Sequence, residues 1–216
     1  MLSKAHCNNV EAVNSDFLTI SPDDPKYGRA THILLDPSCS GSGIVNRMDY
    51  LLDDEEGNDG ESERLNKLAA FQLKMIRHAM TFVSVQRIVY STCSVHATEN
   101  EHVVRQALKT EEAINGKFKL APKQDVLPTW HRRGIPEQVD DAADAESLVR
   151  CSPGEDRTNG FFVSLFMPAK DEGNQWTGIV VDKKKRKAAT DEDPEQPSTK
   201  RKRKKKKNKF AANPSS

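Results

Sequence analysis

Short apolar runs and one long stretch of helical periodicity dominate the first half of the chain. Residues 31–36 (THILLD) and residues 87–94 (RIVYSTCS) each hold an apolar run that predicts a buried strand. Between them, apolar positions recur every three or four residues in residues 64–82. This spacing predicts a helix with an apolar face formed by Leu65, Leu68, Ala69, Ile76, Ala79 and Met80. Gln72 interrupts that face, so we expect a polar group on the side that packs on the sheet.

Further strands lie on both sides of this central unit. Residues 10–20 (VEAVNSDFLTI) hold a short strand that ends near Asp16. Residues 117–122 (KFKLAP) and 160–168 (GFFVSLFMP) hold two later strands, of which the second is strongly apolar. The alternation of strands and helices predicts an α/β fold with a mostly parallel, twisted sheet.

Polar segments separate these elements. Thr98, followed three residues later by Glu101, predicts a capping box that opens a helix through Val103, Val104, Ala107 and Leu108. Residues 49–63 (DYLLDDEEGNDGESE) are acidic, and we interpret them as a loop. The long stretch between the last two strands carries prolines and charges, and we interpret it as a second loop.

The formal net charge of +1 hides two regions of opposite charge. From residue 170 onward the chain has 15 Lys and Arg against 7 Asp and Glu, whereas residues 1–169 have 18 against 25. Most of the basic residues of the second region stand in residues 183–187 and 201–207. Such a segment cannot bury enough apolar surface to fold, so we expect a folded domain over residues 1–169 and a disordered basic tail over residues 170–216. The tail favours nuclear import or contact with RNA phosphates, and a merely solvated tail is the alternative.

The composition argues against several classes of protein. No apolar run approaches the roughly 18 residues that a membrane span needs, and residues 1–10 do not form a signal peptide. Four scattered cysteines (Cys7, Cys39, Cys93 and Cys151) do not make a disulfide scaffold, which indicates reduced thiols in a cytosolic or nuclear protein. No histidine and cysteine stand at zinc-ligand spacing, so we expect no metal site. Because the chain has no long apolar run, we also expect no membrane partner.

Cys39 and Cys93 come shortly after the two central strands. If these strands are parallel neighbours joined by one crossover helix, both thiols lie at the edge of the sheet where α/β proteins bind ligands. A thiolate is a strong nucleophile near neutral pH, so two thiols at that edge favour covalent chemistry. A chance placement of two small buried side chains stays open. So does a cysteine hydrolase with one histidine as its base, although nothing in the sequence points to an Asn or Asp that would orient the candidates His32, His78, His96, His102 and His131.

Two motifs resemble the paired motifs of the Nop/Sun-domain RNA cytosine-5 methyltransferases. They are LLDPSCSGSG at residues 34–43 and IVYSTCS at residues 88–94. The resemblance covers residues 8–168 and includes NSDFL, the helix around Gln72, TENEHVV and NGFFVSLF. The variant DPSCSGSG is similar to the fifth Sun-domain member, which methylates a cytosine of large-subunit ribosomal RNA. The resemblance implies the carboxyl-terminal half of a class I, Rossmann-like fold that uses S-adenosylmethionine.

The same resemblance implies roles for four residues. Cys93, in the Thr-Cys-Ser motif, is expected to add to carbon 6 of cytosine, which makes carbon 5 nucleophilic enough to take a methyl group. Cys39 is expected to assist the release of the product as a general base. Asp36 is expected to hydrogen-bond the cytosine ring and to border the cofactor. Asp16 is expected to bind the adenine amino group, although a plain turn residue is an equal alternative.

The sequence departs from the family pattern in the cofactor site. The family holds S-adenosylmethionine with a Gly-rich loop after its first strand and an acid after its second, and these residues contain no such loop. The family's amino-terminal RNA-binding part is absent too, and the body is acidic. We therefore expect the carboxyl-terminal part of an enzyme that acts on RNA, with ribosomal RNA as the expected substrate, in the nucleus and nucleolus. The alternative is a catalytically incomplete fragment that binds RNA or protein in the nucleolus.

Overall fold

The computed structural model describes residues 3–45 and 59–169 of the 216-residue chain. By its internal contacts the chain divides into two units, residues 1–173 and residues 174–216, and all the elements named below belong to the first. The predicted basic tail and residues 49–58 of the predicted acidic loop lie outside the described residues.

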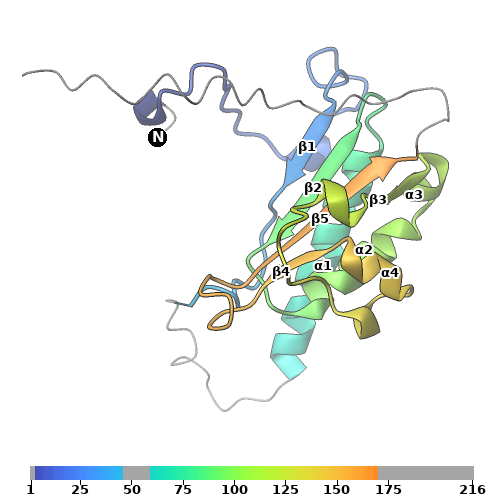
Figure 1. Ribbon diagram of the computed structural model, residues 1–216. Coiled ribbons are helices and arrows are strands. Elements are labelled where there is room, and N and C mark those ends of the chain that lie inside the picture. The colour runs from blue at the N-terminus through green and yellow to red at the C-terminus, as the bar shows by residue number, and fades with distance from the viewer. Residues whose placement is uncertain (1–2, 46–58, 170–216) are drawn as a thin grey trace, which may run out of the picture. The chain divides into compact units, whose positions relative to one another are not determined.

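A five-stranded sheet forms the centre of the first unit (Figure 1). Its strands follow the order β1 (His32–Leu35), β2 (Arg87–Thr92), β5 (Phe161–Pro168) and β3 (Phe118–Leu120), and β4 (Val149–Cys151) pairs with the beginning of β5. β1 and β2 are parallel neighbours, as the sequence predicts, and Leu35 lies opposite Tyr90. The two later strands that the sequence predicts correspond to β3 and β5.

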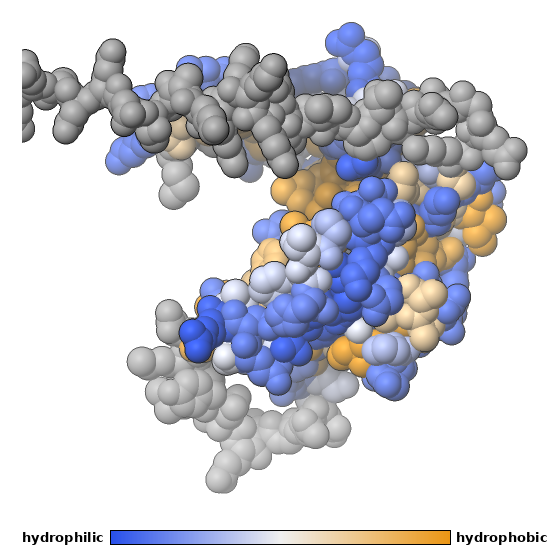
Figure 2. Space-filling model, in the orientation of Figure 1, coloured by the Kyte–Doolittle hydropathy of each residue, from blue (hydrophilic) through white to orange (hydrophobic). Residues whose placement is uncertain are grey.

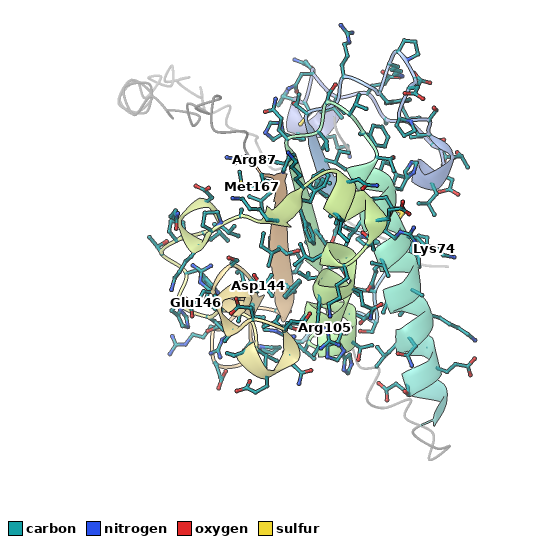
Figure 3. The ribbon with its side chains drawn as sticks, turned by 90° about the vertical axis from the view of Figure 1, so that its right-hand side faces the viewer. Lys74, Arg87, Arg105, Asp144, Glu146 and Met167 are labelled. Atoms are coloured by element: carbon teal, nitrogen blue, oxygen red, sulfur yellow. The ribbon has the colours of Figure 1, made fainter. Side chains whose placement is uncertain are left out.

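The sheet is mixed, whereas the sequence predicts a mostly parallel one. β5 is antiparallel to β2, β3 and β4, so three of the four strand pairs in the described part of the chain are antiparallel. β5 is strongly apolar. It lies between β2 on one side and β3 and β4 on the other, and this position buries Phe162 and Phe166 completely. Figure 3 shows one end of this arrangement, where Arg87 at the start of β2 and Met167 near the end of β5 lie beside each other.

Three helices share one hydrophobic core with the sheet. They are α1 (Asp59–Met80), α2 (Glu101–Leu108) and α3 (Glu111–Asn115). The predicted apolar face of α1 is confirmed, and Gln72 within it is completely buried. α1 begins five residues before the predicted helix, so residues 59–63 are helical and the loop predicted for them is wrong. The buried side chains of this core include Ile76, Ala79, Ile88, Tyr90, Val103, Val104, Phe162 and Phe166.

The predicted capping box at Thr98 and Glu101 is wrong, although the helix that follows it is confirmed. A short 3-10 helix, η4 (Ala97–Glu99), occupies the expected cap, and α2 begins at Glu101 itself. The Glu101 carboxylate is completely buried and accepts hydrogen bonds from the Arg150 guanidinium, at 2.6 Å from both Nε and Nη2. The Glu101 carboxylate pairs with Arg150 instead of capping the helix, because leaving a buried charge without a cation costs more free energy than leaving a helix end uncapped.

The predicted strand in residues 10–20 is also wrong. Asp16 lies at the start of a 3-10 helix, η2 (Phe17–Thr19), and its carboxylate accepts the amide of Leu18 at 3.0 Å. In the described part of the chain no strand pairs with this segment. A strand is stable only when a neighbour satisfies its backbone groups, so the capped turn prevails.

The stretch between β3 and β5, predicted as loop, contains four short elements. These are η5 (Lys123–Asp125), η6 (Pro136–Gln138), α4 (Ala142–Glu146) and β4. They are three to five residues long, too short for a hydrophobic period to appear in the sequence. β4 matters most for the site, because it supplies Arg150 to the buried pair with Glu101.

An apolar groove runs along the face of β1 and β2 opposite the helices. Leu34 of β1 is 70% exposed there. The groove has a volume of about 390 Å³, and Val89, Leu127, Val163 and Leu165 also line it. Figure 2 shows apolar surface where β1 and β2 lie. No helix of residues 3–45 and 59–169 is long and apolar enough to cross a membrane.

Candidate active site

Two loops meet at the carboxyl edge of the parallel strands. The Cys39 loop (residues 36–43) follows β1, and the Cys93 loop (residues 93–96) follows β2. The Sγ atoms of Cys39 and Cys93 lie 3.1 Å apart, and both side chains are half-buried. The prediction that these two thiols share one edge of the sheet is therefore confirmed.

Backbone contacts join the two loops. The amide of Gly43 donates to the Cys93 carbonyl at 2.9 Å, and the amide of Gly160, just before β5, donates to the Gly43 carbonyl at 2.7 Å. A Cβ atom on Gly43 would lie 2.4 Å from the Gly160 oxygen, which no side chain tolerates. The glycine thus permits a close backbone approach, as its place in the motif indicates.

Serine hydroxyls make a second link between the loops. Ser40 and Ser42 of the Cys39 loop both bond the Ser94 hydroxyl, at 3.2 and 3.3 Å. The amide of Val95 donates to the Ser42 hydroxyl at 3.1 Å. These contacts fix the Cys93 loop against the Cys39 loop through the buried Ser94 hydroxyl.

A buried polar network lies behind the Cys39 loop. Gln72, Tyr90 and Glu99 are all completely buried. Tyr90 donates to the Gln72 side-chain oxygen at 3.1 Å and to the Glu99 backbone carbonyl at 2.5 Å, while Gln72 donates to the Glu99 carboxylate at 3.0 Å. The helical periodicity of the sequence predicts the inward-facing position of Gln72, but no pattern in the sequence predicts that of Glu99. Glu99 stands in the TENEHVV motif. Because that motif matches the pattern of a helix cap, its sequence does not indicate that the Glu99 side chain is buried.

The Cys93 thiol is protonated at neutral pH. Burial raises its pKa above the ordinary 9.0, and the hydrogen bond with Cys39 and the negative charge of Asp36 raise it further, to about 11. Addition of this sulfur to an electrophile therefore requires that the thiol proton leaves during the attack.

The structure brings Asp36, but not Asp16, to the two thiols. Asp36 is exposed at the start of the Cys39 loop, where its carboxylate accepts the Ser91 hydroxyl of β2 at 2.9 Å. Asp16 lies beside Phe17, whose ring packs on His78 in the last turn of α1, with ring centroids 4.9 Å apart. That turn leads into the beginning of β2 (Figure 1). Asp16 therefore lies at the end of the sheet opposite the two thiols. The predicted roles of both carboxylates stay predictions.

The side chains of three candidate histidines have partners away from the two thiols. His78 bonds the Ile20 carbonyl, His102 bonds Gln138 and His131 pairs with Asp156. These contacts do not offer His78, His102 or His131 as the base of a cysteine hydrolase, whereas His96 stands in the Cys93 loop itself. Within the part of the chain that the structure describes, no group of three or more His, Cys, Asp or Glu side chains is arranged to hold a metal ion.

Comparisons with known sequences show the family of this chain. The family model of 16S rRNA methyltransferase RsmB/F matches residues 3–167. The 25S rRNA (cytosine-C(5))-methyltransferase rcm1 of Schizosaccharomyces pombe is 43% identical over 173 residues, which are 80% of this chain and 37% of that protein. The 28S rRNA (cytosine-C(5))-methyltransferase of Mus musculus is 42% identical over 170 residues, which are 79% of this chain and 34% of that protein. The chain therefore spans little more than a third of the length of these relatives.

Comparisons with solved structures support the fold. A methyltransferase homologue from Pyrococcus horikoshii matches with a TM-score of 0.57 and 22% identity, covering 78% of this chain and 48% of that one. NSun6 from Pyrococcus horikoshii, solved with SFG, matches with a TM-score of 0.51 and 23% identity, covering 79% and 37%. Both likenesses agree with the predicted class I methyltransferase fold. With the family model matched over almost the whole described chain and the motif cysteines in contact, this chain belongs to the RsmB/F, or Sun-domain, family of rRNA methyltransferases.

Proposed function

We propose that this chain forms the catalytic part of an RNA cytosine-5 methyltransferase that acts on large-subunit ribosomal RNA. The contact of the Cys39 and Cys93 sulfurs at the carboxyl edge of the sheet carries the proposal. The names of the relatives, 25S and 28S rRNA (cytosine-C(5))-methyltransferases, support an RNA substrate and carbon 5 of cytosine as the acceptor. The methyl donor in this proposal is S-adenosylmethionine.

Cys93 acts as the nucleophile. Its sulfur adds to carbon 6 of cytosine as its proton passes to solvent, which reaches the half-buried thiol, and the electron pair of the 5,6 double bond makes carbon 5 nucleophilic enough to take the methyl group. Asp36, held by the Ser91 hydroxyl, hydrogen-bonds the cytosine ring. That bond stabilises the negative charge that builds on the ring during the attack.

Cys39 completes the cycle. After transfer, carbon 5 carries both a methyl group and a proton, and the product is released when that proton leaves. The Cys39 sulfur, which lies against Cys93, takes the proton as a general base. The electron pair of the broken C–H bond restores the 5,6 double bond, and the pair of the broken C–S bond returns to Cys93.

The carboxylates that the resemblance assigns to the cofactor fit unequally. Asp36 is exposed beside the thiols and would border bound S-adenosylmethionine, which supplies an electrophilic methyl group. Asp16 lies at the other end of the sheet and would not contribute in this arrangement. This placement favours a second candidate function, a catalytically incomplete module that binds RNA or protein.

Two cysteine variants test the enzyme. Cys93→Ala is expected to abolish both methyl transfer to RNA and the covalent adduct with RNA that contains 5-azacytosine. Cys39→Ala is expected to keep the adduct and to accumulate it on normal RNA in a form that resists denaturant. Full activity of Cys93→Ala would contradict the proposal. Titration of the 216-residue protein with S-adenosylmethionine in a calorimeter separates the two functions, because the incomplete module gives no heat of binding at micromolar concentration.

The basic tail supports a proposal about location. Its two runs, residues 183–187 and 201–207, suit import receptors and the dense ribosomal RNA of the nucleolus. We therefore place the protein in the nucleus, and within it in the nucleolus.

A further inference from the structure

Glu99 is a buried carboxylate with no role in the steps above. We infer that Glu99 is a positioning residue that holds Cys39 in contact with Cys93. The spatial part of this inference stands on the hydrogen bonds alone, and its meaning for catalysis rests on the proposed function.

Glu99 and Gln72 hold the peptide groups on both sides of Cys39. The amide of Ser40 donates to both oxygens of the Glu99 carboxylate, at 3.0 and 3.3 Å. On the other side, the Gln72 amide nitrogen donates to the Ser38 carbonyl at 3.0 Å and to the same carboxylate at 3.0 Å. Cys39 thus stands in a loop whose backbone is fixed immediately before and immediately after it.

A carboxylate suits this position because it only accepts hydrogen bonds. The donors recorded for Glu99 are a backbone amide and the Gln72 side chain, and both need an acceptor. Both 3.0 Å bonds end on Oε1 of Glu99, and Oε2 lies 3.3 Å from the Ser40 nitrogen. A glutamine at position 99 with its oxygen at the first place would set its own NH₂ group against the Ser40 amide, which is also a donor. The loss would fall on the Cys39 loop, because Tyr90 bonds the Glu99 backbone carbonyl and not the carboxylate.

The geometry of the thiols makes this support consequential. Their sulfurs are 3.1 Å apart, and a misplacement of about 1 Å can lower a rate about 10²-fold. Ser38 and Ser40 lie one residue from Cys39, so a shift of either peptide moves the Cβ of Cys39 directly. The bonds of the Ser40 and Ser42 hydroxyls to Ser94, and those of the Gly43 backbone, hold the loop after Cys39, at residues 40–43.

The spacing of the two thiols can be measured without catalysis. In the Cys7→Ser, Cys151→Ser background, diamide converts the remaining thiols to a disulfide and takes up their two hydrogens as it is reduced to a hydrazine. Diamide first adds to one thiolate, and the second thiol then displaces the reagent. With enough diamide to make the first step fast, the rate of the second step reports how often the sulfurs meet. We expect Glu99→Gln and Gln72→Met each to slow the bridging at least tenfold. Glu112→Gln, which alters a surface pair with Arg77, is the matched control and is expected to change the rate less than twofold.

Tyr90→Phe separates positioning from general stability. It removes two hydrogen bonds of the same buried network but none to the peptides around Cys39. If Glu99 supports only the fold, Glu99→Gln and Tyr90→Phe will each slow bridging in proportion to the fall in their Tm. If Glu99 positions Cys39, bridging slows much more in Glu99→Gln.

Three outcomes overturn the inference. The first is a folded Glu99→Gln protein that bridges at the wild-type rate. The second, decisive if that variant does not fold, is wild-type bridging in Gln72→Met. The third needs no variant: the Ser40 amide of the wild-type protein is expected to exchange its hydrogen at least 100-fold more slowly than in an unstructured peptide, and rapid exchange would show that the carboxylate does not hold it. Full activity of Cys93→Ala would remove the proposed function and leave the bridging result standing, so the two failures are distinguishable.

Discussion

The raised pKa of Cys93 predicts how its reactivity changes with pH. Burial, Cys39 and the charge of Asp36 raise this pKa from 9.0 to about 11. The thiolate, and not the thiol, attacks an alkylating reagent. The rate of Cys93 alkylation by iodoacetamide should therefore continue to rise tenfold per pH unit through pH 10, where an ordinary thiol has levelled off.

The expected rates follow from two opposing effects. At neutral pH, raising the pKa from 9.0 to about 11 lowers the thiolate fraction about 100-fold. The more basic thiolate is the better nucleophile, and with a Brønsted coefficient of about 0.4–0.5 this gain offsets roughly tenfold. The thiolate fraction wins, so Cys93 should react about tenfold more slowly at pH 7.5 than an ordinary thiol of equal access.

Brief alkylation pulses between pH 7 and about pH 12, a range that includes the expected midpoint near 11, followed by mass spectrometry of the separate cysteine peptides, give a rate for each thiol. In Cys39→Ser the midpoint for Cys93 should fall, because that change removes the thiol that raises the pKa. It should stay above 9.0, because burial is the largest cause. A wild-type midpoint near 9.0, or a midpoint that Cys39→Ser leaves unchanged, would refute the reasoning.

Three further predictions concern the structure around the site and the tail. Arg150→Met leaves the Glu101 carboxylate buried without its cation and should lower the free energy of unfolding in urea by about 3–5 kcal/mol. Adding Glu101→Met to that variant should restore most of the lost stability. Equal stability of the single and the double variant would contradict this prediction. Gly43→Ala forces apart two backbones and should cost about 1–3 kcal/mol, whereas the control Gly60→Ala, with open space around it, should cost nothing in the same urea titration. Deletion of residues 183–209 should remove nucleolar fluorescence of a tagged protein, and unchanged fluorescence would disprove the role of the basic runs.

The part of the fold that carries the thiols was predictable from the sequence because its signals are long or strong. Residues 87–92, which form β2, include an apolar run, and α1 repeats its apolar face over many turns. A parallel pair with a crossover helix leaves one arrangement of the strand ends. The contact of Cys39 with Cys93 follows from that arrangement.

The errors fall where a local signal competes with tertiary contacts. Glu101 satisfies the pattern of a capping box, but a buried pair with Arg150, distant in sequence, stabilises it more. Asp16 follows a segment with the composition of a strand, but strand formation depends on a neighbour that the local sequence does not reveal. Glu99 was missed for the same reason, since its partners come from three other segments of the chain.

Strand register connects the fold to the chemistry. Cys39 stands four residues after Leu35, and Cys93 stands three residues after Tyr90, the residue opposite Leu35 in the parallel pair. Slipping β1 by one residue would move its end about 3.3 Å, which exceeds the distance between the two sulfurs. It would also turn Leu35 out of the core and the exposed Leu34 into it. The residues that fix this register, the core of β1 and the Tyr90 network behind it, therefore decide whether two thiols 54 residues apart can act on one base.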